Sequence, residues 1–470
     1  VSGTIIMNTD QNTGIASKGR QVTNSGTITL VKNNSTGISA ENADVINSAG
    51  AKIEVKDKES VGIYAKMSGD VDKKVTNTGT ISLETNTGTP DKSAAIYSLV
   101  DGGTGTGTGI LTTENNGTIN VDQKDSVGIF AQNNGTANTR SVVKNTKIIN
   151  VSKEGSAGIL GDKSTITNSG TGTEGIILTA KKTAGIIGKK DSVVNNTGRI
   201  ETNTATPTVA TEGLVGISLS ESTAINSGSI VLDTAHSTGI FGEENSKIIN
   251  DKIGTIELKK DGNVGIYSNS NIGEVINKGV ITAIGTASAG ISVKLEDTIG
   301  NKNVAGKNTG TIEIKGTKSA AMLGLIDSKT TVANSKLALE NSGEIKIGTN
   351  ESVGMMVTNN STTLTKNKVT ATNKTGGVIN LESTNAGDKK NIGILANEKA
   401  TGTNEGTIEV KTLESVGMLG QAASEVINRN TINLIAEKGI GMLAKDATST
   451  ALNDGDINVT GKKSSGMLAK

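Results

Sequence analysis

The chain has 470 residues, with 60 Gly, 2 Pro, no Cys, no Trp and only five aromatic side chains, and a formal net charge of +1. A compact globular core normally takes much of its buried area from aromatic residues, so this composition disfavours such a core, while the apolar third of the chain disfavours disorder. The near-neutral charge predicts no nucleic-acid partner, and no apolar run approaches the roughly 20 residues of a membrane-spanning helix, so we expect no direct membrane insertion.

A repeated unit fills the whole chain. Its first mark is an Asn two residues before Gly in the pattern N-x-G-x-I; the pattern is degenerate in places, as where Lys147 and Asn430 replace the Gly. This Asn, or its counterpart, falls at Asn24, Asn47, Asn77, Asn115, Asn145, Asn168, Asn196, Asn226, Asn250, Asn277, Asn308, Asn341, Asn373, Asn404, Asn428 and Asn453. The second mark is the apolar residue after Gly or Ala in S-V-G-I. It follows the Asn by 14 residues in ten of the sixteen units, and Val1 to Ile15 repeats the spacing, which makes seventeen copies.

Each copy predicts three short strands in chain order. The first ends at the Asn, as in Val22–Asn24; the second alternates apolar and polar residues, as in Ile28–Leu30; the third carries S-V-G-I. Period-two patterning with β-branched residues indicates strands with one buried face, and no segment shows the helical period. Three strands per repeat, separated by Gly and Asn corners, predict a right-handed parallel β-helix (a solenoid) of about seventeen coils, continuous over residues 1–470.

Stacking explains why the repeat is so uniform. Each strand would lie on its counterpart in the next coil, so inward residues stack on their equivalents. We expect the Asn amides to bond to one another as a ladder, and the Asn to tolerate a left-handed corner conformation. The Gly two residues later would supply a second position permissive of unusual backbone angles.

The repeat resembles the passenger repeats of the large fusobacterial autotransporter (type V secreted) adhesins. The segments that carry the resemblance are SVGIYA at 60–65, SVGIFA at 126–131 and NTGTI at 77–81 and 308–312. The resemblance implies a non-enzymatic adhesin segment, secreted to the bacterial cell surface. It would be anchored by an outer-membrane barrel that is missing from this chain, so the chain would be part of a longer passenger. The implied partners are host-cell surface glycans or protein receptors and other bacteria.

The alternative is a β-helical polysaccharide lyase or hydrolase. Its acids could be Glu59, Asp125, Glu351 and Glu414, which recur before the Ser of S-V-G-I, although a solvated corner also explains them. The single histidine, His236, lies in a predicted exposed turn without a partner pattern. No metal-ligand spacing and no cofactor motif occurs, so we expect no metal and no cofactor.

All five aromatic residues occupy one slot, directly after the apolar residue of S-V-G-I: Tyr64, Tyr97, Phe130, Phe241 and Tyr267. Other copies place Leu, Ile or Met there. Two interpretations remain open. Strict alternation would turn the slot outward, as an apolar stripe that binds or packs; a bend in the chain would instead make it part of the core.

Insertions supply the other candidate site. The segment between S-V-G-I and the next Asn lengthens in three successive coils, within residues 66–142, and again in three coils within 294–368. Stacking would place the three insertions of each cluster side by side, where repeat proteins commonly carry recognition loops. The candidate ligand-binding residues are therefore Tyr64, Tyr97, Asp101, Phe130, Asn133, Lys294, Asp297, Asp327, Lys329 and Asn359.

Overall fold

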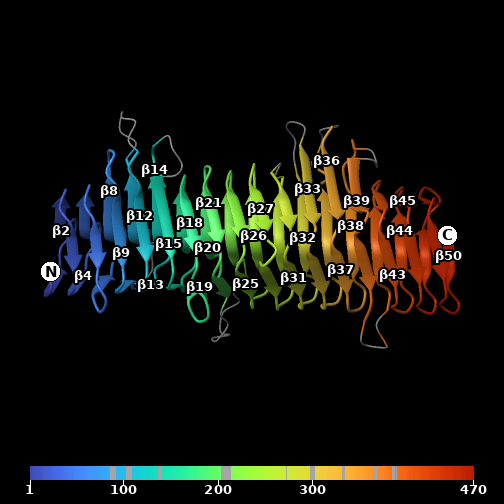
Figure 1. The fold of residues 1–470 in the computed structure, drawn as a ribbon, viewed down its shortest axis with the longest axis horizontal. Helices are drawn as coiled ribbons and strands as arrows, with labels where there is room; N and C mark the ends of the chain where they lie inside the picture. Colours follow the sequence, from blue (N-terminus) through green and yellow to red (C-terminus); the bar gives the residue numbers. More distant parts are fainter. Residues whose placement is uncertain are drawn as a thin grey trace. The chain divides into compact units, whose positions relative to one another are not determined.

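The computed structural model describes residues 1–84, 91–101, 108–135, 140–202, 213–270, 273–296, 302–330, 334–364, 368–383, 387 and 389–470. The chain forms two compact units, Val1–Thr234 and Ala235–Lys470. In each unit the strands follow one another around three parallel sheets, here named A, B and C, and every third strand returns to the same sheet (Figure 1). This order confirms the predicted right-handed parallel β-helix, with about seventeen coils in the chain.

The first unit contains β1 to β25. Sheet A holds β1 (Thr4–Met7), β4 (Thr27–Leu30), β7 (Lys52–Val55), β10 (Thr80–Leu83), β13 (Thr118–Val121), β16 (Ile148–Val151), β19 (Gly175–Leu178), β22 (Arg199–Thr202) and β25 (Ser229–Leu232). Sheet B holds β2 (Thr13–Lys18), β5 (Thr36–Glu41), β8 (Val61–Met67), β11 (Ala94–Val100), β14 (Val127–Asn133), β17 (Ala157–Asp162), β20 (Ala184–Lys189) and β23 (Val215–Ser220). Sheet C holds β3 (Val22–Asn24), β6 (Val45–Asn47), β9 (Lys73–Asn77), β12 (Leu111–Asn115), β15 (Ser141–Asn145), β18 (Thr165–Asn168), β21 (Val193–Asn196) and β24 (Thr223–Asn226).

The second unit contains β26 to β50. Sheet A holds β28 (Thr255–Leu258), β31 (Val280–Ala283), β34 (Thr311–Ile314), β37 (Glu344–Ile347), β40 (Val378–Leu381), β43 (Thr407–Val410), β46 (Thr431–Leu434) and β49 (Asp456–Val459). Sheet B holds β26 (Thr238–Glu243), β29 (Val264–Asn269), β32 (Ala289–Leu295), β35 (Ala320–Ile326), β38 (Val353–Asn359), β41 (Ile392–Asn397), β44 (Val416–Gln421), β47 (Ile440–Ala444) and β50 (Ser465–Ala469). Sheet C holds β27 (Lys247–Asn250), β30 (Val275–Asn277), β33 (Asn303–Asn308), β36 (Lys336–Asn341), β39 (Val369–Asn373), β42 (Thr401–Asn404), β45 (Glu425–Asn428) and β48 (Thr450–Asn453).

The repeat marks stack in register within each unit. On sheet A of the first unit, Ile28 pairs with Ile53 and Ile53 with Ile81, and all three side chains are fully buried. On sheet A of the second unit, Ile312 pairs with Ile345 in the same way. Because each aliphatic side chain rests on an identical one, the narrow core is filled without aromatic residues.

The Asn ladder is present in both units. In each step, Nδ2 of one Asn donates to Oδ1 of the Asn in the next coil: Asn47 to Asn77 at 2.7 Å, Asn77 to Asn115 at 2.8 Å and Asn308 to Asn341 at 2.8 Å. The ladder runs from Asn24 to Asn226 in the first unit and from Asn250 to Asn453 in the second. Every buried amide in these runs is therefore paired with its own kind.

The prediction of a left-handed conformation at this Asn is wrong. None of the ladder residues has a positive φ; the left-handed corner lies instead at the residue before the Ser of S-V-G-I, as at Glu59 (φ 55°), Asp125 (φ 53°) and Glu351 (φ 52°). The ladder Asn lies at a strand end and uses its side chain, not its backbone, to make the corner.

The explanation offered for the corner Gly is also wrong. Gly79 and Gly343 are needed for close approach: a Cβ on Gly79 would lie 2.4 Å from the Ala51 carbonyl oxygen, and one on Gly343 would lie 2.1 Å from that of Gly310. No L-residue side chain fits at that distance, so the stacking of neighbouring coils, rather than an unusual φ, requires Gly there.

No helix among the described residues is long and apolar enough to cross a membrane.

Candidate functional site: the outer elbow of sheet B

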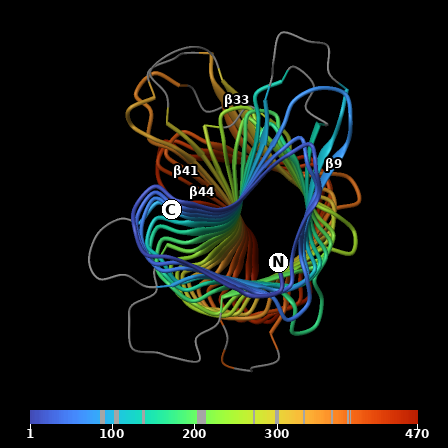
Figure 2. The ribbon, with the colours of Figure 1, turned by 90° about the vertical axis from the view of Figure 1, so that its left-hand side faces the viewer.

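Each sheet B strand bends at the Gly of S-V-G-I. In β8, Gly62 and Ile63 are both buried, while Val61 before them and Tyr64 after them are half-buried. The pairing of β8 with β11 also skips Gly62 and its counterpart Ala95. Two successive inward residues turn the strand, so the outward side chains on either side of the turn converge. We call these two columns of outward side chains the outer elbow. In Figure 2, the end-on view, the strands of each unit bend toward the inside of the coil at this position.

The aromatic slot therefore faces outward. In the first unit, Tyr64, Tyr97 and Phe130 occupy successive strands of the outer elbow and are half-buried. Tyr97 and Phe130 stack with ring centroids 4.7 Å apart and planes 8° apart, and Tyr64 tilts against Tyr97 at 5.3 Å and 56°. The Tyr97 hydroxyl donates to Gln132 Oε1 at 2.6 Å, and burial raises the pKa of this hydroxyl. Both faces of the Tyr97 ring are covered by neighbouring rings.

In the second unit the outer elbow is largely aliphatic. Leu395, Leu419 and Leu443 are less than a tenth exposed, although their slot points away from the core. They are covered by outward side chains from both columns: Val353, Met356, Ile392, Val416, Ile440 and Leu468. The elbow thus forms a small second apolar cluster outside the β-helix.

A hollow of about 330 Å³ interrupts this cluster. It arises because three outward side chains are small: Ala289 and Ser292 on β32 and Ala320 on β35. Ser292 lies in the aromatic slot between Tyr267 and Leu323 in the sheet register. The remaining lining residues are Val264, Ala287, Ser288, Lys318, Ser319, Leu323, Glu351, Val353 and Met356. The walls are apolar, and two exposed charged residues at left-handed corners, Lys318 and Glu351, stand at the rim.

Tyr267 lies one strand away from Ser292, which lines this hollow, and is not itself one of the lining residues. Its ring contacts Phe241 on one side, with centroids 5.6 Å apart. On the other side its partner in register is Ser292, whose hydroxymethyl group is too small to cover an aromatic ring. The aromatic group of the second unit therefore contains two rings, whereas that of the first unit contains three.

The insertions lengthen the strands of sheets B and C. In the first unit β8, β11 and β14 have 7 residues where β5 has 6, and β9, β12 and β15 have 5 where β6 has 3. The lengthened strands pair with one another, as with Leu111 and Lys73, so the described strand ends from which these insertions extend are in register. Within each unit Figure 1 shows the long strands projecting past the shorter ones. Asp101, at this edge, forms an ion pair with Lys66 at 2.7 Å.

Asn133 and Asn359 have a structural role that their sequence positions did not reveal. Asn133 is 3% exposed: its Oδ1 accepts from the Gly135 backbone N–H at 2.9 Å, and its Nδ2 donates to the Lys163 carbonyl oxygen at 3.3 Å. Lys163 Nζ returns a hydrogen bond to the Gly135 carbonyl oxygen at 3.1 Å. We call this reciprocal arrangement the clasp; it covers the last long coil where the next coil is shorter.

The second unit repeats the clasp. Asn359 is fully buried, accepts from the Ser361 N–H at 3.1 Å and donates to the Lys399 carbonyl oxygen at 3.4 Å. Lys399 Nζ donates to the Ser361 carbonyl oxygen at 2.8 Å. Both asparagines therefore hold insertions together and do not face solvent.

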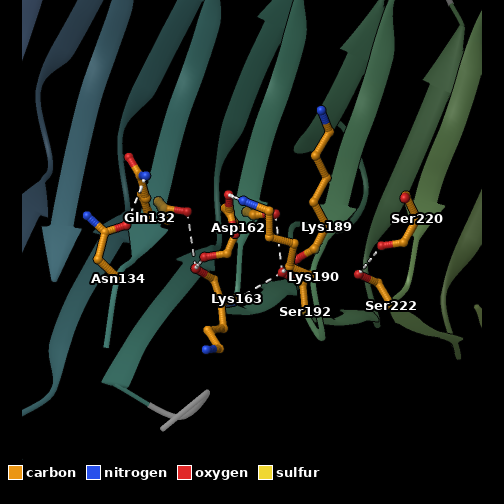
Figure 3. A network of polar contacts seen from close by, with 12 residues as sticks. Gln132, Asn134, Asp162, Lys163, Lys189, Lys190, Ser192, Ser220 and Ser222 are labelled. Atoms are coloured by element: carbon orange, nitrogen blue, oxygen red, sulfur yellow. Dashed lines mark hydrogen bonds and ion pairs between the residues drawn. The ribbon is translucent and has the colours of Figure 1, made fainter. Parts of the chain in front are cut away.

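Polar contacts continue along the corner after the first clasp. In Figure 3, Lys163 follows Asp162, whose carboxylate pairs with Lys190 Nζ at 2.9 Å, and Ser192 Oγ donates to the Lys189 carbonyl oxygen at 2.7 Å. Each such surface pair contributes little to stability on its own, but together the contacts hold the turn in one conformation.

Three of the charged residues predicted in the second cluster join one ion network. Glu296 Oε2 lies 2.5 Å from Lys294 Nζ, Glu296 Oε1 lies 2.9 Å from Lys329 Nζ, and Lys294 also pairs with Asp327 at 3.4 Å. Hydrogen bonds from Lys294 and then Lys329 lower the pKa of Glu296, and a backbone hydrogen bond from Lys329 is the largest effect lowering the pKa of Asp327. Asp297 lies outside the described residues.

The residues considered for catalysis lie at left-handed corners. His236 is exposed with φ 52°, and Glu59, Asp125, Glu351 and Glu414 occupy the same corner of other coils. Among the described residues, no three His, Cys, Asp or Glu side chains gather closely enough to hold a metal ion.

Sequence reasoning missed the small residues of the outer elbow. It followed the large members of the aromatic slot and passed over Ser292, which lies between Tyr267 and Leu323 in the slot. It also missed the second column, which includes Ala289 and Ala320. The sequence did contain a signal: when the copies are aligned, Ser292 is a small residue in a slot that is large in most copies.

Residues 173–368 and 363–470 match the model of the BigA third pectate lyase-like domain, and together they span more than half of the chain. The chain belongs to this family. It is therefore a BigA-type β-helix domain of a bacterial surface protein, as the resemblance implied. The family description calls the domain pectate lyase-like, which is a statement about the type of domain. The second match lies wholly in the second unit, and the first contains the hollow. Among curated proteins, no sequence matches this chain.

Proposed function

We propose that this BigA-type β-helix is a non-enzymatic binding domain of a bacterial adhesin, acting at the cell surface on host-cell glycans or receptors or on other bacteria. The observation that carries the proposal is the outer elbow. An outward sheet face needs only polar residues, yet this one keeps large apolar side chains in strand after strand of both units. The elbow residues that are only half-buried, such as Tyr64, Tyr97 and Phe130, keep part of this apolar surface accessible to a partner.

The insertions support the same function. They border the outer elbow because they extend the same sheet B strands that carry Tyr64, Tyr97, Phe130 and Leu323. The clasps and ion pairs hold these extensions in fixed positions, so a partner meets a preformed surface and little ordering is needed on binding.

Binding of the purified domain to host epithelial cells and to other bacteria tests the proposal. One variant shortens the three insertions of residues 66–142 together to the length of the neighbouring coils; a second treats 294–368 in the same way. We expect each trimmed variant to remain folded and to lose much of the cell binding. Unchanged binding by a variant lacking both clusters would contradict the role of the insertions.

The alternative function is a polysaccharide lyase or hydrolase, and the pectate lyase-like description of the family favours testing it. Polyuronates and neutral polysaccharides are incubated with the domain, with and without calcium. Unsaturated chain ends would indicate a lyase, and new reducing ends alone would indicate a hydrolase. Under the proposal neither product accumulates.

A further inference from the structure

We infer that the hollow beside Tyr267 binds one neutral pyranose ring of a glycan chain. This inference rests on the proposed function and names the ligand class for one part of the outer elbow. It depends on three features of the hollow: its size, its apolar walls and its charged rim.

The size and the walls fit a small ring. A volume of about 330 Å³ lies at the lower end of the range for ligand pockets. Leu323, Met356, Ala289 and Ala320 line the hollow with apolar side chains. A pyranose has a face of C–H groups that packs on such side chains.

The rim supplies hydrogen-bonding groups of both kinds. Lys318 can donate and Glu351 can accept, and both stand on left-handed corners at the edge of the hollow. A sugar hydroxyl both donates and accepts, so one ring can satisfy both residues. Because the two charges cancel, the rim offers no net attraction to an anionic sugar, so we assign the hollow to neutral sugars rather than uronic acids.

The fold does not require the hollow. The same slot holds Tyr64, Tyr97, Phe130 and Leu395 in other coils, so a large side chain at Ser292 is compatible with the sheet. This permits a clean test by filling. Ser292→Phe should occupy the hollow, and Ser39→Phe is the matched control, because Ser39 lies in the same slot of the first unit, between Ala16 and Tyr64.

Saturation-transfer NMR and calorimetry measure binding of cellotetraose, of the tetramer of N-acetylglucosamine and of tetragalacturonate to the whole domain. We expect one or both neutral tetramers to bind and tetragalacturonate to bind more weakly. Ser292→Phe should abolish the neutral binding, and Ser39→Phe should leave it unchanged.

Each contrary result is decisive. No binding of either neutral tetramer, equal losses in the two Phe variants, or a preference for tetragalacturonate would overturn the inference. Cell binding measured on the same proteins separates this from the proposed function: a domain that adheres to cells but binds no sugar refutes the hollow alone, whereas sugar binding without adhesion refutes the adhesin role alone.

Discussion

Tyr97 and Tyr267 occupy the same slot of the same sheet, yet they are placed to do different things. In the first unit Tyr97 lies between Tyr64 and Phe130, so its ring faces are used within the molecule. In the second unit Tyr267 has Phe241 on one side and Ser292 on the other, beside a hollow. The first group therefore contains three rings and the second only two, because the neighbour one coil away is aromatic in the first unit and a serine in the second.

The two units otherwise share one scaffold, and the largest expected effect tests this. Asn115→Leu in the first unit and Asn308→Leu in the second each remove the hydrogen bond from the Asn of the preceding coil and the one to the Asn of the following coil. Each should lower the free energy of unfolding by about 3 kcal/mol, measured by chemical denaturation. Asn134→Leu, at an exposed position, is the control and should change it little. Clearly unequal losses at Asn115 and Asn308 would show that the two ladders differ.

The clasps should likewise be equivalent. Asn133→Ala and Asn359→Ala each remove a buried side chain that is hydrogen-bonded to backbone groups on both sides of the clasp, so each should cost about 2 kcal/mol. Hydrogen exchange should locate the loss in the insertion next to the substituted residue. A loss spread over the whole unit would contradict the local role of the clasp.

The two aromatic groups, unlike the two clasps, should contribute unequally to the free energy of unfolding. Tyr97→Ser removes a ring packed on two others and should cost about 2 kcal/mol, whereas Tyr267→Ser removes a ring with one aromatic partner and should cost about 1 kcal/mol. Thermal or denaturant unfolding measures both variants. An equal or reversed order would mean that Tyr267 is covered more fully than its neighbours indicate.

The smallest expected effect is a loss of local stability at acidic pH. The folded-state pKa of Glu296 is lowered by Lys294 and Lys329, so its contribution is present above the unfolded-state pKa of about 4.3 and is lost as pH falls through the folded-state value. The hydrogen-exchange protection factors of residues 294–296 and 327–330, which are corrected for the intrinsic exchange rate at each pH, should therefore fall slightly between about pH 5 and pH 3. Glu296→Gln should remove most of this pH dependence, and an unchanged profile in the variant would assign it to other carboxylates.

The sequence alone determined the coil, its three strands and the amide ladder. This was possible because a parallel β-helix pairs each strand with its own copy, so every contact of the core repeats in the chain at a readable spacing. Inward pairs such as Ile312 and Ile345, and ladder pairs such as Asn308 and Asn341, could be listed from the alignment of the copies.

The features that depend on the path of the backbone between the repeated residues were decided only by the tertiary structure. Alternation from the inward Ile63 turns Tyr64 outward, as one of the two interpretations expected; the sequence could not show that the bend lies at Gly62, before this slot, and therefore does not turn the slot into the core. Asn133 and Asn359 look like loop residues in the sequence, but the shorter coil that follows each of them makes it a buried clasp. The hollow beside Tyr267 depends on small side chains from two strands meeting at that bend, and this convergence exists only once the coil has folded.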